Sequence, residues 1–104
     1  MNPKYLILVA LLLSESIGAM ARQPDPMGRK IYESKCTRCH GRDGTRGLFG
    51  AKNLQTSKLD DKTLYETISE GRRIMPSWKE KLTPEEIHQV VRYVKTLRST
   101  HNQQ

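Results

Sequence analysis

The chain has 104 residues, with 18 Lys and Arg against 11 Asp and Glu, so it is one small basic domain of net charge +7. Such a surplus is typical of proteins that meet nucleic acid, anionic membrane surfaces or acidic proteins. The basic residues are scattered rather than gathered in one tract. Because the first residues also indicate export, we expect no nucleic-acid partner.

Residues 1–21 have the pattern of an export signal. Lys4 gives a positive start, an apolar run covers 5–13, and Ala19-Met20-Ala21 matches a small-x-small cleavage site. The apolar run is too short to cross a bilayer, which takes about 20 residues. We therefore predict a cleaved signal peptide over 1–21 and a domain over 22–104 with no membrane span after cleavage. An uncleaved anchor is the alternative.

A first helix is predicted from Asp25 as its cap and Pro26 at its first position, running to about Lys35. Gly28 falls inside this helix, where glycine is less favourable than alanine by up to about 1 kcal/mol. Either the glycine sits near a frayed helix start, or another helix packs closely against it.

Cys36, Cys39 and His40 form the C-x-x-C-H pattern of covalent haem attachment, and they include both cysteines of the chain. Two thiols at this spacing can add to two vinyl groups of one porphyrin, and the next imidazole can ligate its iron. A short-loop disulfide, a thioredoxin-like pair and half of a zinc site are the alternatives. The sequence offers neither zinc-ligand spacing nor a βαβ context, so the pattern favours one haem c. A porphyrin would also give so small a domain an apolar centre.

The stretch 41–50 has glycine at 41, 44, 47 and 50, and it predicts a surface loop without a regular element. After this loop, in Lys52-Asn53-Leu54, we expect Leu54 to be the residue that makes an apolar contact. A second helix is then predicted, with Asp60 or Asp61 as its N-cap and Gly71 just after its end.

Residues 72–78 predict an extended segment, because Pro76 disfavours a helical conformation at the residue before it. In this segment Trp78 either caps a haem edge or fills the core. Arg72, Arg73 and Lys52 are candidates for pairing with haem propionates.

The final helix is predicted by the capping box of Thr83 and Glu86 and by Pro84 in the first turn. Its apolar stripe has helical spacing and consists of Ile87, Val90, Val91, Val94 and Leu97. No repeat and no second domain follow from the pattern.

Met75 is the candidate for a second axial ligand opposite His40. Two of the other methionines fall in the predicted signal, and Met27 lies in the helix that leads to the cysteines. A thioether suits iron and raises the reduction potential relative to a second imidazole. The alternative for Met75 is gap-filling core. His88 is the rival ligand, with His101 behind it.

Taken together, these residues resemble the class I monohaem cytochromes c of bacterial type. The resemblance implies an all-α cytochrome c fold, with three main helices and loops wrapped around one covalent haem. It also implies that the first and last helices cross at the glycine of the first. The residues that carry it are Gly28 with Tyr32, Cys36-x-x-Cys39-His40-Gly41, Asn53-Leu54, Met75-Pro76 and the helix from Thr83 to Tyr93.

The resemblance also implies thioether links from Cys36 and Cys39 and axial ligation of iron by His40 and Met75. The family often has proline where this chain has Lys52, with the carbonyl of that residue accepting the N–H of the haem histidine. Every residue has a carbonyl, so this hydrogen bond can survive here. We further expect Leu54 and Trp78 to contact the haem.

The predicted function is electron transfer, with haem iron cycling between Fe(II) and Fe(III) in a periplasmic respiratory or dehydrogenase-linked chain. We expect a soluble, monomeric carrier rather than an enzyme, with acidic redox proteins as partners and a rate that falls with salt. The alternatives are a haem subunit of an oxidoreductase complex, a haem enzyme or ligand sensor with an open sixth site, and a thiol-disulfide protein without haem.

Overall fold

The computed structural model describes residues 26–101, and for 99–101 it describes the backbone only. The predicted signal over 1–21, its cleavage site and the helix cap Asp25 lie outside the described residues. None of the described helices is both long enough and apolar enough to span a membrane.

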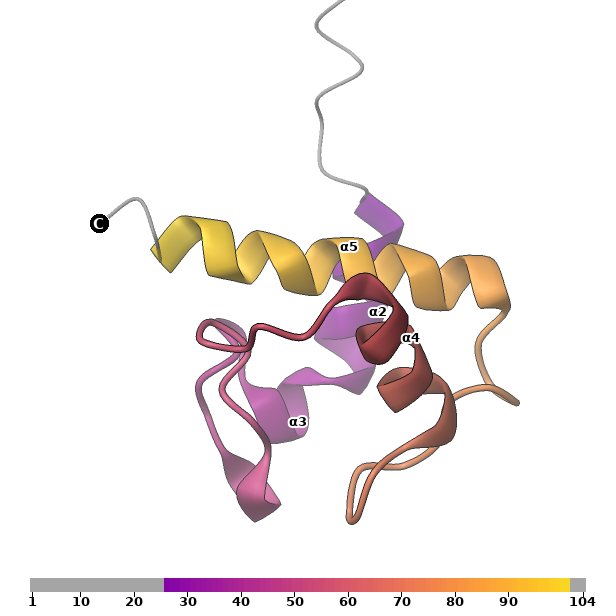
Figure 1. The fold of residues 1–104 in the computed structure, drawn as a ribbon, viewed down its shortest axis with the longest axis horizontal. Helices are drawn as coiled ribbons and strands as arrows, with labels where there is room; N and C mark the ends of the chain where they lie inside the picture. The colour runs from indigo at the N-terminus through magenta and orange to yellow at the C-terminus, as the bar shows by residue number, and fades with distance from the viewer. Residues whose placement is uncertain (1–25, 102–104) are drawn as a thin grey trace, which may run out of the picture.

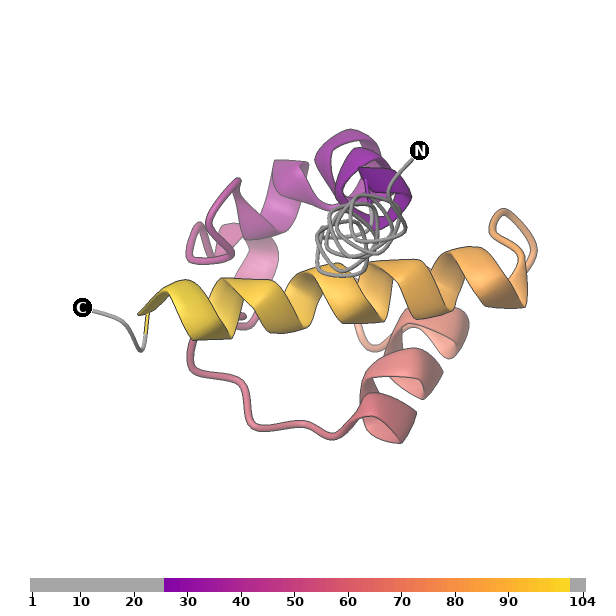
Figure 2. The same cartoon turned by 90° about the horizontal axis from the view of Figure 1, so that it is seen from above.

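The described chain is all-α, as predicted. Three main helices account for half of it: α2 (Pro26–Lys35), α4 (Asp61–Glu70) and α5 (Pro84–His101). Two short elements follow α2, namely α3 (Thr37–His40) and the 3-10 turn η2 (Leu48–Gly50). The long α5 crosses the molecule, with the loops hanging from one side of it (Figure 1). Seen from above, α2 and α4 lie on opposite sides of α5 (Figure 2).

The crossing of α2 over α5 depends on Gly28. A Cβ at this position would lie 2.1 Å from the carbonyl oxygen of Gln89 and 3.3 Å from the Cβ of Tyr93. One turn later, the rings of Tyr32 and Tyr93 lie 5.2 Å apart. The predicted crossing at the glycine is therefore confirmed, and Gly28 is not a residue of a frayed end.

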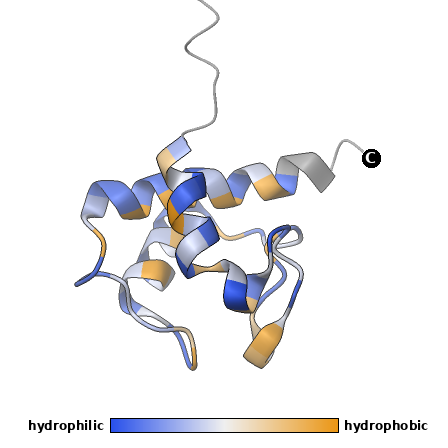
Figure 3. Cartoon of the chain, turned by 180° about the vertical axis from the view of Figure 1, so that it is seen from behind, coloured by the Kyte–Doolittle hydropathy of each residue, from blue (hydrophilic) through white to orange (hydrophobic). Residues whose placement is uncertain are grey.

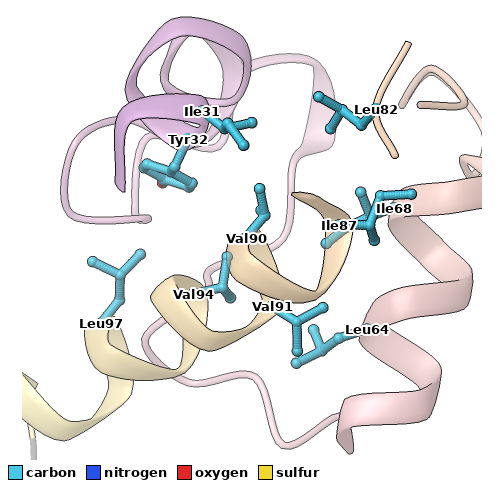
Figure 4. Close-up of a cluster of buried hydrophobic side chains, with 10 residues drawn as sticks. All are labelled: Ile31, Tyr32, Leu64, Ile68, Leu82, Ile87, Val90, Val91, Val94 and Leu97. Carbon is cyan, nitrogen blue, oxygen red and sulfur yellow. The ribbon is translucent and has the colours of Figure 1, made fainter. Parts of the chain in front are cut away.

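The core forms on two sides of α5. Hydrophobic residues alternate with hydrophilic ones along each helix, which leaves one apolar face per helix (Figure 3). Figure 4 shows Val90 and Val94 turned toward α2 and Val91 turned toward Leu64 of α4. The buried apolar side chains are Ile31, Tyr32, Leu64, Ile68, Leu82, Ile87, Val90, Val91, Val94 and Leu97.

The helix ends follow the predicted capping rules. The Thr83 amide donates to Glu86 Oε1 at 2.9 Å, and the Glu86 amide donates to Thr83 Oγ1 at 3.1 Å, so the capping box is formed. At the start of α4, the Thr63 amide donates to Asp60 Oδ1 at 2.8 Å. Asp60 is thus the N-cap, and Asp61 is the first helical residue.

Two loop predictions need correction. The glycine-rich stretch was expected to hold no regular element, but it contains η2. The segment 72–78 was expected to be extended, but Arg72 and Met75 exchange backbone hydrogen bonds of 3.1 and 3.0 Å and close a tight turn. Pro76 restricts the backbone of Met75, the residue before it. Arg73 and Ile74 are not restricted and can form the turn.

Candidate cofactor site

The segment with both cysteines continues from α2 almost without a break. The Cys36 amide donates to the Tyr32 carbonyl at 2.9 Å, and the His40 amide donates to the Cys36 carbonyl at 3.0 Å. The Tyr32 hydroxyl donates to the Gly41 carbonyl at 2.6 Å and closes the far end of this segment. The helix crossing therefore fixes where Cys36, Cys39 and His40 lie.

Both thiols are free and half-buried, so the short-loop disulfide is not formed. Burial raises the pKa of Cys36 to about 11, although Lys35 acts in the opposite direction. A cysteine active in thiol-disulfide exchange has a lowered pKa instead. Among the described residues, no cluster of three or more His, Cys, Asp and Glu could hold a metal ion. The local chemistry therefore favours neither a thioredoxin-like pair nor a zinc site.

His40 is oriented by a backbone carbonyl. Its Nδ1 lies 3.1 Å from the carbonyl oxygen of Lys52. Because a carbonyl can only accept, Nδ1 carries the proton, and the lone pair of Nε2 remains available for a metal. Burial, as the largest effect, lowers the pKa of His40, and the bond to Lys52 opposes it. The hydrogen bond expected at Lys52 is thus present, despite the missing proline.

Leu54 is positioned by the loop that follows His40. Its amide donates to the Gly44 carbonyl at 2.9 Å, and a Cβ at Gly44 would lie 2.8 Å from the Cβ of Leu54. The half-buried Leu54 packs against the core. The Arg46 amide also donates to the His40 carbonyl at 2.9 Å, so the loop returns to the attachment segment.

Met75 lies over a glycine. Gly71 has φ +74, and a Cβ there would lie 2.6 Å from the Met75 carbonyl oxygen and 2.8 Å from the Ser77 amide nitrogen. This close approach and the tight turn from Arg72 fix the backbone at Met75. The side chain is half-buried and packs against the core.

Trp78 is held beside the end of α2. Its amide donates to the Ile68 carbonyl at 3.1 Å, and its half-buried ring packs against the core. The ammonium nitrogens of Lys35 and Lys81 lie 5.5 and 5.4 Å from the ring centroid. Since Lys35 directly precedes Cys36, the indole lies near the attachment segment.

The rival ligand His88 lies elsewhere. Its exposed ring packs on Tyr65 of α4, with centroids 4.5 Å apart, in an open groove that Asp61, Lys62 and Glu66 also line. The side chain of His101 is outside the described part of the chain.

Sequence reasoning missed two supports of the site. One is the hydrogen bond from Tyr32 to Gly41, and the other is the contact of Gly71 with the segment after Met75. The glycine was noted as a helix end, but its second role depends on a segment that folds back over it. The candidate propionate partners Lys52, Arg72 and Arg73 are exposed.

A family model described as "Cytochrome C oxidase, cbb3-type, subunit III" matches residues 23–94. The chain belongs to the cytochrome c family. The donor set fits this result, because an imidazole with a free Nε2, a thioether and two free thiols are the groups that hold a haem c. In this fold Cys36, Leu54, Met75 and Trp78 all pack against the same core.

The relatives of this cytochrome fall into two kinds. It is 36% identical to the cbb3-type cytochrome c oxidase subunit FixP of Azorhizobium caulinodans, over 67% of this chain and 26% of the relative. It is 37% identical to the corresponding subunit CcoP of Cereibacter sphaeroides, over 64% of this chain and 25% of the relative. It is also 32% identical to cytochrome c6 of Anabaena variabilis, over 64% of this chain and 84% of the relative. The cytochrome therefore spans about a quarter of the two oxidase subunits and most of the cytochrome c6.

Proposed function

We propose that this cytochrome is an exported, monomeric electron carrier of a periplasmic respiratory or dehydrogenase-linked chain. In this proposal residues 1–21 are a cleaved signal, and the domain over 22–104 holds one haem c through Cys36 and Cys39. The observation that carries it is the 3.1 Å contact of His40 Nδ1 with the Lys52 carbonyl, because it leaves Nε2 as a metal ligand. Met75 supplies the second ligand.

The bound haem supplies one-electron chemistry between Fe(II) and Fe(III). The residues of the chain hold its surroundings still. The Lys52 carbonyl keeps the His40 imidazole in one orientation, and the contact over Gly71 keeps the Met75 backbone in place. Leu54 and Trp78, which pack against the core, would contact the haem. Ligands that move little on oxidation allow fast electron transfer. Two retained axial ligands would also leave no open coordination position on the iron for a substrate.

The charge of the chain supports acidic redox partners. Between residues 35 and 58 there are six bases, Lys35, Arg38, Arg42, Arg46, Lys52 and Lys58, and one acid, Asp43. By contrast, several bases on the helices outside this stretch form ion pairs, such as Arg29 with Glu33 and Lys95 with Asp61. A surface of one sign speeds the approach of an oppositely charged protein, and salt reduces the effect.

A second candidate is a haem subunit of an oxidoreductase complex. The matching family model and the names FixP and CcoP, which are those of oxidase subunits, favour it. The two candidates differ in assembly. A carrier purifies from its native membrane fraction as a free monomer after a salt wash, whereas a subunit stays with the complex.

The test is the visible absorption spectrum of the protein after export from a host that attaches haem c. We expect sharp low-spin bands in the reduced form that survive denaturation, and the weak near-red thioether-to-iron band in the oxidised form. Met75→Ala should keep the haem, lose the near-red band, lower the potential and admit carbon monoxide. Met27→Ala, an exposed methionine on α2, is the matched control. An unchanged potential in Met75→Ala would disprove the ligand assignment.

A further inference from the structure

A groove between α4 and α5 lies outside the candidate haem site. Its lining consists of Asp61, Lys62, Tyr65 and Glu66 of α4 and His88 of α5. None of these residues belongs to the segments that carry the predicted haem residues, and α4 lies on the opposite side of α5 from α2 (Figure 2). With a volume of about 430 Å³, the groove has room for a long side chain of another molecule.

Two stacked rings line the groove together. The ring centroids of Tyr65 and His88 lie 4.5 Å apart, and the ring planes differ by 32°. Tyr65 is half-buried and packs against the core, whereas His88 is exposed. The face of a tyrosine ring carries partial negative charge and attracts cations. Aromatic side chains that remain accessible in this way are typical of sites where one protein binds another.

Acidic side chains are concentrated around this groove. Residues 60–70 and 84–91, which are α4 with its cap and the first two turns of α5, include six acids and one base. The chain as a whole has 18 bases and 11 acids, so this region has the opposite sign. The acids are Asp60, Asp61, Glu66, Glu70, Glu85 and Glu86, and the base is Lys62.

The ion pairs of this region leave its acids in excess and accessible. Bases from other parts of the chain pair with three of the acids, so six acids stand against four bases in all. Within the groove, Lys62 Nζ lies 3.9 Å from Glu66 Oε1, and both side chains are largely exposed. Exposed ion pairs contribute little to stability. A better placed cation can therefore displace Lys62 from Glu66. The three outside pairs are Lys79 with Glu70, Arg92 with Glu85 and Lys95 with Asp61.

We propose that this groove binds an arginine side chain presented by a basic segment of a partner protein. The planar guanidinium stacks on the Tyr65 ring and donates hydrogen bonds to the Glu66 carboxylate, since a guanidinium can make both contacts at once. The aliphatic stem of the arginine lies along the ring of His88. This partner has the opposite charge to the acidic redox proteins expected at residues 35–58. The cytochrome can thus be held by a basic partner while it exchanges electrons with an acidic one.

The proposal goes beyond electron transfer, and it is tested on the haem-loaded protein with a short peptide of alternating arginine and serine at low ionic strength. The same peptide with citrulline in place of arginine is the comparison, because citrulline has nearly the same shape without the charge. Binding is followed by the backbone amide signals in the NMR spectrum of the reduced protein. We expect the arginine peptide to shift the signals of residues 61–66 and His88, and to bind at least about tenfold more tightly than the citrulline peptide. The absorption spectrum of the same samples tests the proposed function separately.

The charge arm of the test compares Glu66→Gln with Glu33→Gln. Both glutamates are exposed and pair with a base four residues earlier, Glu66 with Lys62 and Glu33 with Arg29. The two changes remove the same charge, but only Glu66 lies in the groove. Glu66→Gln should weaken peptide binding about fivefold, and Glu33→Gln by less than about twofold. Equal effects would reduce the attraction to net charge and overturn the proposal.

The aromatic arm uses Tyr65→Leu, Tyr65→Phe and His88→Gln. Leucine keeps an apolar contact with the core but removes the ring, so binding should weaken about fivefold. Phenylalanine keeps the ring, and binding should stay within about twofold of the original. His88→Gln changes an exposed side chain, so it tests the groove without disturbing the core, and it should weaken binding about threefold. Equal losses in Tyr65→Phe and Tyr65→Leu would contradict stacking on the ring.

Three further outcomes would also overturn the proposal. The first is that the arginine peptide does not bind, or binds no more tightly than the citrulline peptide. The second is that the shifted signals lie around other acids, such as Glu33 or Asp43, and not around the groove. The third is that a higher protein concentration, without peptide, shifts the groove signals together with those of residues 35–58, because a second copy of the chain is then the occupant.

Discussion

The helices and the loops of this cytochrome are held by different means. The helical scaffold, defined as α2, α4 and α5, is joined by buried side chains on two sides of α5 (Figure 4). The ligand loops, defined as 41–59 and 71–82, bury only Leu82 among their large apolar side chains. They are fixed by backbone hydrogen bonds and by close contacts at Gly44 and Gly71.

This difference separates stability from ligand geometry. Changes in the scaffold remove packing from the whole domain, because one core serves all three helices. Changes in the ligand loops move the backbone under Leu54 or Met75 and leave that core in place. A steric clash of the same size should therefore lower the stability of the domain when it lies in the scaffold, and displace a candidate haem residue when it lies in a ligand loop.

The largest effect on stability is expected for Gly28→Val. Its Cβ would overlap the Gln89 carbonyl, at 2.1 Å, and push α2 away from α5. We expect a loss of about 3 kcal/mol in the free energy of unfolding, measured with denaturant on the haem-loaded protein. Gly50→Ala is the control, because nothing lies within 4 Å of its Cβ and only its φ of +78 is unfavourable; its loss should stay near 1 kcal/mol. Equal losses would refute the crossing.

A smaller effect on stability, but a larger one on the iron, is expected for Gly71→Ala. The added Cβ would press on the Met75 carbonyl at 2.6 Å, in a backbone conformation that alanine disfavours. We expect a loss of about 2 kcal/mol together with a weakened near-red band and carbon monoxide binding. Gly28→Val should keep the band under native conditions. If Gly71→Ala kept it too, the glycine would not position Met75.

Tyr32→Phe tests the link between the two regions. The Tyr32 hydroxyl, which is fully buried, donates to Gly41 at 2.6 Å and joins α2 to the first ligand loop. Its removal leaves a carbonyl without its partner, so we expect a loss of about 1 to 2 kcal/mol in denaturant unfolding. Tyr65→Phe is the control, because its hydroxyl has no hydrogen bond within the described residues; it should change stability by less than about 0.5 kcal/mol.

The smallest effect concerns pH and the cap of α4. The hydrogen bonds from Thr63 hold the pKa of Asp60 below its ordinary value of 3.8. The folded protein thus binds this proton more weakly than the unfolded chain, so the contribution is complete above pH 3.8 and is lost as the pH falls below it. Asp60→Asn keeps a cap but does not titrate. Thermal unfolding of the two proteins from pH 5 down to about 3 should show the extra loss in the original protein only.

The sequence predicted the scaffold well because its signals are local. Asp60, Thr83 and Glu86 form caps with residues three positions away, and the apolar stripe of α5 needs only helical spacing. The crossing at Gly28 has no local signal. The residues alone allowed either a frayed helix start or a helix packed against the glycine, and only the family resemblance favoured the crossing.

The loops were predicted less well because distant residues determine them. The turn from Arg72 to Met75 depends on backbone pairing across the turn and on the missing side chain of Gly71, against which the Met75 carbonyl packs. Neither the pairing nor the packing against Gly71 produces a periodic pattern in the sequence. The candidate ligand His40 was found from its motif, but the choice of Lys52 as its carbonyl partner required the folded loop or a known relative.

The crossing of α2 with α5 also determines when the core can form during synthesis of the chain. Ile31 and Tyr32 find their partners, Val90 and Tyr93, only when nearly the whole chain is available. A chain emerging from its N-terminus therefore has no finished core until α5 has emerged. Contacts so distant in sequence slow folding. Cys36 and Cys39 thus stay accessible on the growing chain, and they become half-buried only once α5 has packed on α2.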